Sequence, residues 1–292
     1  MKHILFGFLT LSALTILSCC KEVGPEINLH GGSGSVADTT YIESPVASAE
    51  AKNVLIEEFT GVQCPNCPAG HAQVVTLKSQ YPGRVTGIAL HPSNALGYPY
   101  PYSAQNLIDA SSTTLLNYLG SPGFEPCAGI DRQLFSNQTN ILTDRNYWAG
   151  FTAQELALSP KVNILLSDAY NASTNVVTVV AELHYTQDVT QVNNITVALT
   201  EDSIVTAQLN GATVDTFYVH NDALRMLLTG NTGDNVAYNA NVTLVAGRVV
   251  RLVYQATLKP AWKPEHMHVV AYVHEHASSQ VVYQVKEIKL TN

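Results

Sequence analysis

The sequence has few basic residues: 15 lysines and arginines stand against 23 aspartates and glutamates in 292 residues, for a net charge of −8. Because it also lacks a Lys/Arg block, we do not expect it to bind nucleic acid. Its N-terminal apolar stretch at residues 4–17 is too short to cross a bilayer as a helix. Five cysteines include a single Cys-x-x-Cys pair, which excludes a zinc ribbon. The hydrophobic share of 46% is enough for two domains.

Residues 1–18 are expected to be a signal peptide, because Lys2 precedes an apolar stretch of the right length. The stretch ends in Ile-Leu-Ser-Cys at residues 16–19, which resembles a bacterial lipobox. Cys19 would then become the lipidated mature N-terminus, and its acyl chains, palmitate among them, would anchor the protein stably in a membrane of the cell envelope. An ordinary secretory signal peptide is the alternative, and Cys20 leaves open which cysteine is modified.

The chain after the signal peptide divides into a tether and two domains. Residues 19–50, rich in Gly and Ser, are expected to form a flexible tether. Residues 51–158 alternate between strand and helix patterns, which favours an α/β domain. In this part the patterns predict strands at 54–60, 84–91 and 128–132 and helices at 69–80 and 102–119.

Residues 159–292 have a different character, with short β-rich runs separated by Asn, Gly and Asp clusters. The expected strands are 161–166, 176–185, 195–201, 213–220, 242–257 and 269–274. This spacing is typical of an antiparallel, Ig-like β-sandwich. The predicted fold class is therefore α/β plus all-β, with the border near Ser159.

The sequence Cys64-Pro65-Asn66-Cys67 lies between a predicted strand and a predicted helix, the sequence form of a thioredoxin-like redox site. With Cys64 at the N-cap and Pro65 in the first turn, helix N–H groups would stabilise the Cys64 thiolate. Cys64 is then the expected nucleophile and Cys67 the resolving thiol. A permanent disulfide is the alternative, because Pro68 and the lack of a Trp before Cys64 depart from common oxidoreductase sites.

The thioredoxin-like pattern implies two further site residues. In such proteins an acidic residue six positions before the first cysteine lies buried beneath the second and takes its proton. Glu58 has this offset, although the sequence does not decide whether Glu58 or Glu57 faces the cysteines. The same resemblance implies a cis-proline before a strand, with Pro126 as the candidate and Pro122 second. The backbone beside it would pair with an extended substrate chain.

Cys127 directly follows that proline and would then face the cysteine pair. It is a candidate third redox partner, or a ligand, with Cys64 and Cys67, of a soft site for Cu(I) or Zn(II), in which His71 is a further candidate ligand. The alternative is a small buried residue, since free Cys packs as a hydrophobe. Apart from this candidate metal site, the only expected redox group is the Cys64–Cys67 disulfide, which persists outside the cytosol.

Several segments together resemble a known family. They are the lipobox, the run VLIEEFTGVQCPNCPAGH at 54–71, the proline loop that leads into 130–132, HNDALR at 220–225 and HVVAYVHE at 268–275. The chain thus resembles the twenty-eight-kilodalton outer-membrane lipoprotein family of Bacteroidetes-type bacteria. This resemblance implies a lipoprotein with a thioredoxin-like domain and an appended β-sandwich, of a kind often described as surface antigens or adhesins.

Three functional hypotheses follow. The first is a membrane-anchored protein that exchanges thiols and disulfides with protein or peptide partners. The second is a surface-exposed binding protein or adhesin in which the thioredoxin-like half is only a scaffold. The third is a copper-handling protein. The partner, the direction of electron flow and the side of the membrane are left open.

Overall fold

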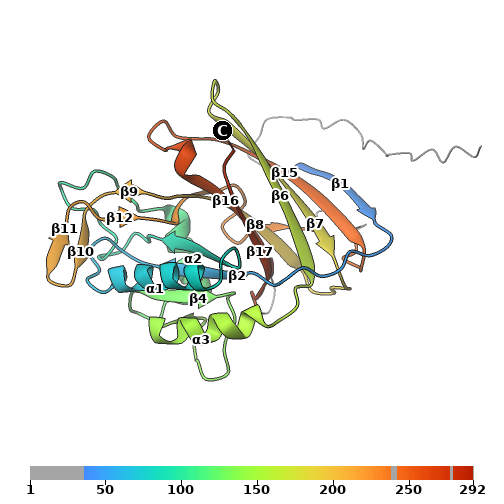
Figure 1. Cartoon of the computed structure of the whole chain (residues 1–292), viewed down its shortest axis with the longest axis horizontal. Coiled ribbons are helices and arrows are strands. Elements are labelled where there is room, and N and C mark those ends of the chain that lie inside the picture. The colour runs from blue at the N-terminus through green and yellow to red at the C-terminus, as the bar shows by residue number, and fades with distance from the viewer. Residues whose placement is uncertain (1–35, 238–241, 277–278, 292) are drawn as a thin grey trace, which may run out of the picture.

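The computed structural model describes residues 36–237, 242–276 and 279–291, so the expected signal peptide, Cys19 and Cys20 lie outside it. Within these residues strands predominate (Figure 1). The α-helices are α1 (Cys67–Gln80), α2 (Ala110–Leu119) and α3 (Arg145–Leu156), and a 3-10 helix, η1, spans Pro264–His266. The coarse prediction of a mixed α/β and β-rich chain is confirmed. No helix in the described part of the chain is long and apolar enough to cross a membrane.

The largest sheet in the described part of the chain is mixed and has nine strands. In spatial order its strands are β17 (Val282–Lys289), β16 (Met267–Glu275), β8 (Asn193–Glu201), β13 (Ala223–Leu227), β3 (Val85–Leu90), β2 (Val54–Phe59), β4 (Cys127–Ile130) and β5 (Leu142–Thr143), while β14 (Asp234–Asn235) pairs with β8. Strands β2 and β3 are parallel, with α1 between them in sequence, and β4 runs antiparallel to β2. The carboxyl end of β2 leads directly into the Cys64–Cys67 segment.

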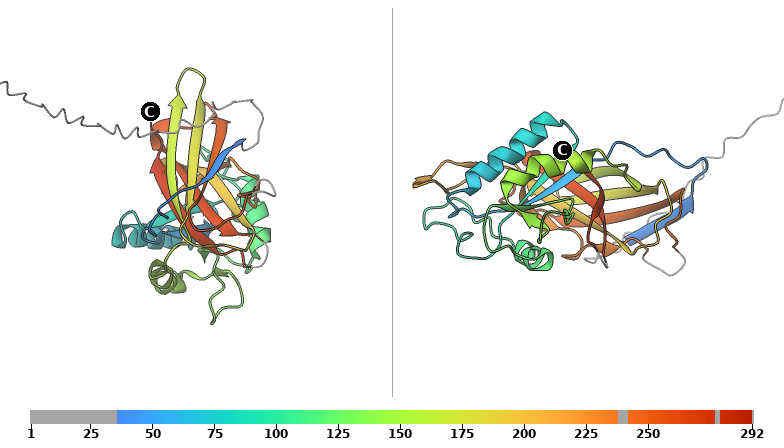
Figure 2. Two further views of the ribbon diagram at one scale, coloured as in Figure 1. Left: turned by 90° about the vertical axis from the view of Figure 1, so that its right-hand side faces the viewer. Right: turned by 90° about the horizontal axis from the view of Figure 1, so that it is seen from below.

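Helices cover both faces of the part built from β2, β3 and β4 (Figure 2). Side chains from α1 and α3, including Val74 and Trp148, pack with Val54 and Ile56 on one face. Side chains of α2 pack with Leu55 and Phe59 on the other. Because successive strand residues point to opposite faces, β2 is buried along its whole length, which explains its continuous apolar run.

A second, antiparallel sheet faces the C-terminal strands of the first. Its order is β1 (Val36–Ile42), β15 (Arg248–Thr257), β7 (Val176–Tyr185) and β6 (Val162–Asn171). Burial alternates along β7, so one face of this sheet is turned inward. Its inward residues, such as Val179 and Leu252, pack against Val197 of β8 and Val269 of β16 in one apolar core. These strands therefore form two packed β layers.

The two halves of the chain share the larger sheet. The expected border near Ser159 falls between α3 and β6, but β8, β13, β16 and β17 come after it and extend the sheet of β2 and β3. A single residue pair, Ala223 with Ala89, joins β13 to β3. Sequence periodicity carries no signal for such a long-range strand pair.

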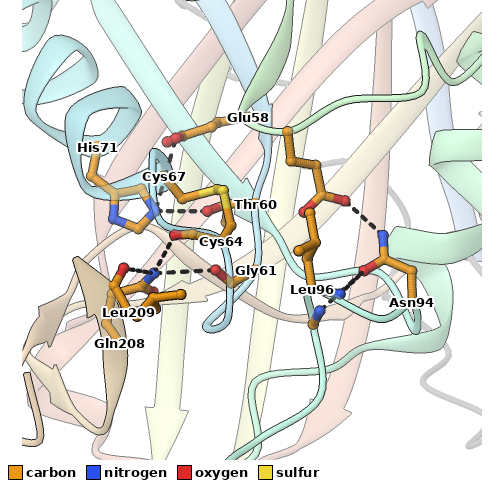
Figure 3. Close-up of a disulfide and its surroundings, with 12 residues drawn as sticks. Glu58, Thr60, Gly61, Cys64, Cys67, His71, Asn94, Leu96, Gln208 and Leu209 are labelled. Atoms are coloured by element: carbon orange, nitrogen blue, oxygen red, sulfur yellow. Dashed lines mark hydrogen bonds and ion pairs between the residues drawn. A yellow bond between two sulfur atoms is a disulfide. The ribbon is translucent and has the colours of Figure 1, made fainter. Parts of the chain in front are cut away.

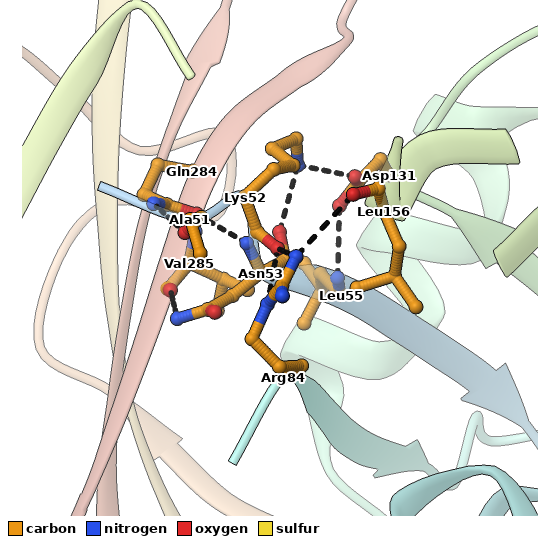
Figure 4. A network of polar contacts seen from close by, with 9 residues as sticks. All are labelled: Ala51, Lys52, Asn53, Leu55, Arg84, Asp131, Leu156, Gln284 and Val285. Atoms are coloured by element: carbon orange, nitrogen blue, oxygen red, sulfur yellow. Dashed lines mark hydrogen bonds and ion pairs between the residues drawn. The ribbon is translucent and has the colours of Figure 1, made fainter. Parts of the chain in front are cut away.

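A polar network also ties the halves together (Figure 4). Buried Lys52 forms an ion pair with Asp131, whose other carboxylate oxygen accepts the Leu55 N–H at 2.8 Å. The next residue, Asn53, donates its backbone N–H to Gln284 of β17 at 2.8 Å. These contacts hold the start of β2 between β4 and the C-terminal strand.

Several element predictions need correction. The helix predicted at 102–119 begins only at Ala110, because the Asp109 side chain caps it by accepting the Ser111 and Ser112 N–H groups. The strand predicted at 213–220 is two short strands, β11 (Thr213–Asp215) and β12 (Val219–His220), which pair with β10 (Gln208–Asn210) and β9 (Ile204–Val205). The strand predicted at 242–257 begins at Arg248, and α3 and β17 were not predicted. Strand β1, which pairs with β15, lies inside the segment 19–50 that was expected to be a flexible tether, so the end of that segment belongs to the fold.

Candidate functional site

Cys64 and Cys67 form a disulfide in the turn between β2 and α1, with 5.4 Å between their Cα atoms (Figure 3). Helix α1 starts at Cys67 with Asn66 as its N-cap, so the predicted placement of Cys64 at the N-cap and Pro65 in the first turn is wrong. The reason is a preceding turn, in which the Cys67 N–H contacts the Cys64 carbonyl at 3.4 Å. Cys67 is therefore the sulfur nearer to the helix N–H groups.

Both sulfur-bearing residues are buried: Cys64 is 1% exposed and Cys67 is fully covered. Part of the cover is the loop that follows β3. The Gln63 backbone N–H donates to the Leu96 carbonyl at 2.8 Å, and the Gln63 side chain donates to the Tyr98 carbonyl at 2.7 Å. The site is thus closed in this state, although an open thiolate was expected.

The rest of the cover comes from the C-terminal half, as the β10–β11 hairpin. The Gln208 side-chain amide donates to the carbonyls of Gly61 at 3.2 Å and Cys64 at 3.1 Å. The Leu209 N–H donates to the Val62 carbonyl at 2.8 Å, and the Gly211 N–H donates to the Pro65 carbonyl at 3.0 Å. We name the segment 204–222 the cover segment. In Figure 1 its strands lie beside and above the start of α1.

Glu58 is the acidic residue on the α1 side of the sheet, where Figure 3 shows it next to Cys67. Its carboxylate packs closely against α1 at Gly70. A Cβ added at Gly70 would lie 2.4 Å from Glu58 Oε1 and 2.9 Å from Pro126 Cβ. Glu58 is 3% exposed, and its Oε1 has no hydrogen-bond partner among the described residues. Burial, and then the nearby Asp222, raise the pKa of Glu58 well above its usual value.

Glu57 points to the opposite face and has a structural role. Its two carboxylate oxygens accept hydrogen bonds from Arg132 Nε and Nη2, both at 2.7 Å, and Arg132 also donates to Tyr272 at 2.7 Å. Alternation along β2 thus answers the question that the sequence left open: Glu58 lies on the same face as α1. Arg132, to which sequence reasoning gave no role, neutralises the buried Glu57.

The peptide bond before Pro126 is cis, as expected, and Pro126 directly precedes β4. The prediction that Cys127 faces the cysteine pair is wrong. Cys127 pairs with Phe59 and packs in the apolar cluster on the α2 side, whereas Glu58 and α1 lie on the other side. It is a buried free thiol whose pKa is raised by burial and then by Glu125 and Glu58.

His71 lies one turn after Cys67 and is held from two sides. Its Nε2 lies 3.0 Å from Thr60 Oγ1 and 3.8 Å from Glu58 Oε1, and its Nδ1 lies 2.8 Å from the Tyr218 hydroxyl. Burial lowers the pKa of His71 to about 4, so the ring is neutral near pH 7. Among the described residues no three His, Cys, Asp or Glu side chains are arranged to hold a metal ion, so the soft metal set is not assembled.

A pocket of about 550 Å³ lies between α1, β3 and the cover segment. Glu58, His71, Tyr218 and Asp222 are among the residues that line it. Asp222 forms an ion pair with Lys78 at 2.6 Å, and its pKa is raised to about 6, mainly by burial. Tyr218 and Asp222 were missed as site residues; the HNDALR motif at 220–225 was noted, but without a role.

Comparison with solved structures finds similar folds. HBP35 of Porphyromonas gingivalis aligns over 84% of this chain and 77% of its own, with 18% identity and a TM-score of 0.62. Protein AGR_C_4864 from Agrobacterium tumefaciens aligns over 84% of this chain and 97% of its own, with 13% identity and a TM-score of 0.50. At these identities the likeness concerns the fold alone.

A domain of the outer membrane lipoprotein Omp28 from Porphyromonas gingivalis matches 45% of this chain and 89% of its own, with 19% identity and a TM-score of 0.32. A search of curated proteins finds no match. The family model described as outer membrane protein Omp28 matches residues 112–292, a region that includes the cover segment but begins after the disulfide. Since this match covers more than half of the chain, the protein belongs to the Omp28 family of outer membrane proteins.

Proposed function

We propose that this outer membrane lipoprotein exchanges thiols and disulfides with polypeptide partners, and that residues 51–158 are a thioredoxin-like unit. The strand order β3-β2-β4-β5 supports this unit, together with parallel β2 and β3, antiparallel β4 and a cis-proline before β4. The Ig-like description of the second half and the acyl chains on Cys19 remain predictions.

One observation carries the proposal: Glu58 is buried beside the disulfide with an unpartnered carboxyl oxygen. Leaving a buried polar group without a partner costs about 1–3 kcal/mol. A permanent disulfide gains nothing from such a group, whereas a disulfide that opens needs a proton for the leaving sulfur. Perturbed titratable groups in a pocket are typical of reactive sites.

The roles follow from the placement of the groups. A partner thiolate attacks Cys64, Cys67 leaves and takes the proton of Glu58, and a second partner thiol then releases Cys64. The backbone next to Pro126 would hold the partner chain in an extended form. No cofactor other than the disulfide takes part.

Exchange requires the cover segment to move, because Cys64 is 1% exposed. Gln208 is the residue to change, since its amide holds the carbonyls of Gly61 and Cys64. Two hydrogen bonds of about 1 kcal/mol each give Gln208→Ala an expected increase of about tenfold or more in the rate of reduction by dithiothreitol. An unchanged rate would show that the hairpin does not control access.

The proposal is tested by trapping a partner. Cys67→Ser leaves Cys64 able to form a mixed disulfide that is not resolved, and Cys64→Ser is the matched control. Incubation with an unfolded, disulfide-containing polypeptide should give a reducible adduct with Cys67→Ser alone. If neither variant forms an adduct, even in the Gln208→Ala background, the exchange reaction is refuted.

Burial of both sulfurs favours a second candidate, a surface binding protein in which the disulfide is a fixed cross-link. The double variant Cys64→Ser/Cys67→Ser should then bind host cells or peptides as the wild type does. Loss of binding on this change alone, with an unaltered unfolding midpoint, would argue against it. Copper handling by Cys64 and Cys67 requires the reduced protein, and dialysis against Cu(I) that shows no tight uptake would exclude it.

A further inference from the structure

Glu58 has a protonation problem that the cysteines alone do not solve. When the disulfide is reduced, Glu58 gives its proton to Cys67 and is left as a buried carboxylate. Such an anion is unfavourable away from water and would take the proton back, which returns Cys67 to the thiolate that closes the disulfide again. Glu58 lines the pocket but is only 3% exposed, so a neighbouring group that supplies its proton would speed the completion of reduction.

We infer that His71 and Tyr218 form a relay that carries this proton between the pocket and Glu58, an inference that rests on the exchange reaction proposed above. Tyr218 is half-buried in the pocket wall, and its hydroxyl lies 2.8 Å from His71 Nδ1. On the other side of the ring, His71 Nε2 lies 3.8 Å from Glu58 Oε1. Imidazole has a nitrogen on each side and can pass a proton by exchanging tautomers.

A dithiol partner loses two electrons and two protons and becomes a disulfide, while Cys64 and Cys67 gain two electrons and two protons. The proton on Cys67 comes from Glu58. The new Glu58 carboxylate takes a proton from His71 Nε2, His71 Nδ1 takes one from the Tyr218 hydroxyl, and Tyr218 regains its proton at the pocket. On re-oxidation the proton moves in the opposite direction.

The gap of 3.8 Å is longer than a hydrogen bond, and Glu58 Oε1 has no other partner in the described structure. Contacts of this kind tighten when charge appears, and a Glu58 anion attracts the N–H of His71. Thr60, which lies 3.0 Å from the same nitrogen, keeps the ring edge at this position. The contribution of Tyr218 means that the C-terminal half completes the site.

The other titratable groups that face the relay do not replace it. His220 lies 6.0 Å from both His71 and His91 between ring centroids, and burial lowers the pKa of His220 to about 3 and that of His91 well below its usual value. Both rings are therefore neutral near pH 7. Asp222 is paired with Lys78, and Tyr218 has a pKa of about 12, raised mainly by burial. Tyr218 therefore rests as a neutral donor.

The first test is the pH profile of reduction by dithiothreitol, followed as thiol formation. At pH 8, His71→Asn should be slower than the wild type by on the order of a hundredfold, the lower end of general acid–base effects. Tyr218→Phe should be slower in the same direction, and both deficits should shrink toward pH 6, where solvent protons are more abundant. Imidazole, which is small enough for the pocket, should restore the rate of His71→Ala. Tyr170→Phe, in β6, removes a hydroxyl outside this site and is the control.

A second measurement does not depend on exchange. The infrared carboxyl band of protonated Glu58, identified by its loss in Glu58→Gln, shifts when D₂O replaces H₂O, and the relay should make this shift fast in the wild type and slow in both variants. Equal deficits at every pH, no rescue by imidazole, or an unchanged rate of band shift would overturn the relay. If Cys67→Ser forms no adduct but the wild type shows a relay-dependent band shift, the exchange function is refuted and the relay is left intact.

Discussion

The contact of Glu58 and Pro126 with α1 gives a sharp test at Gly70. A Cβ at Gly70 would lie 2.4 Å from Glu58 Oε1 and 2.9 Å from Pro126 Cβ, so Gly70→Ala requires Glu58 and either Pro126 or the helix to shift. Inserting a methyl group into a packed site costs about 1–3 kcal/mol. Replacing Gly by Ala inside a helix raises the free energy of unfolding by up to about 1 kcal/mol, because Ala has the higher helix propensity.

Gly150 provides the matched control. It lies within α3 and is exposed, and no atom within 4 Å would meet a Cβ there, so Gly150→Ala receives the helix gain alone. Both variants receive the same stabilisation from the helix propensity of Ala, so this contribution cancels when they are compared. Gly70→Ala should therefore be less stable than Gly150→Ala by about 1–3 kcal/mol. Urea unfolding followed by circular dichroism measures this difference. Equal stability of the two variants would refute the packing of Glu58 and Pro126 on α1.

Two further predictions concern buried charge and pH. Arg132→Met removes the partner of buried Glu57 and should lower the free energy of unfolding by about 3–5 kcal/mol in urea titrations; a loss below 1 kcal/mol would contradict the pairing. His268 lies 3.0 Å from Glu287 and 3.4 Å from Asp202, and hydrogen bonds to these carboxylates raise its pKa to about 9. A raised histidine pKa contributes stability that is complete below about pH 6.5 and lost as pH rises through 9, so His268→Gln should destabilise the protein at pH 6 and match the wild type near pH 10. A pH-independent effect would contradict this linkage.

Local patterns in the sequence were enough to place the centre of the site. The strand before Cys64 and the helix after Cys67 follow from spacing and turn chemistry, and the cis-proline at 126 follows from the resemblance to thioredoxin-like proteins. The choice between Glu57 and Glu58 did not follow, because it depends on which face α1 covers. The covering of Cys64 by Gln208 did not follow from the sequence either, because the two residues are more than a hundred positions apart.

The extended sheet shows the same limit. Strand β13 joins β3 through one pair, Ala223 with Ala89, and neither residue carries a distinctive pattern. Tyr218 is an ordinary aromatic residue in the sequence and becomes a site residue only because β9 and β12 bring it over α1. Long-range pairing therefore decides how the second half contributes to the site.

The reduction potential of the Cys64–Cys67 pair tests the central claim most directly. It is measured by equilibrating the protein with glutathione or dithiothreitol buffers and trapping the free thiols with an alkylating agent. An exchange site should have a potential above about −300 mV, within reach of partner thiols. A potential well below that value would make the pair a permanent cross-link and contradict the account.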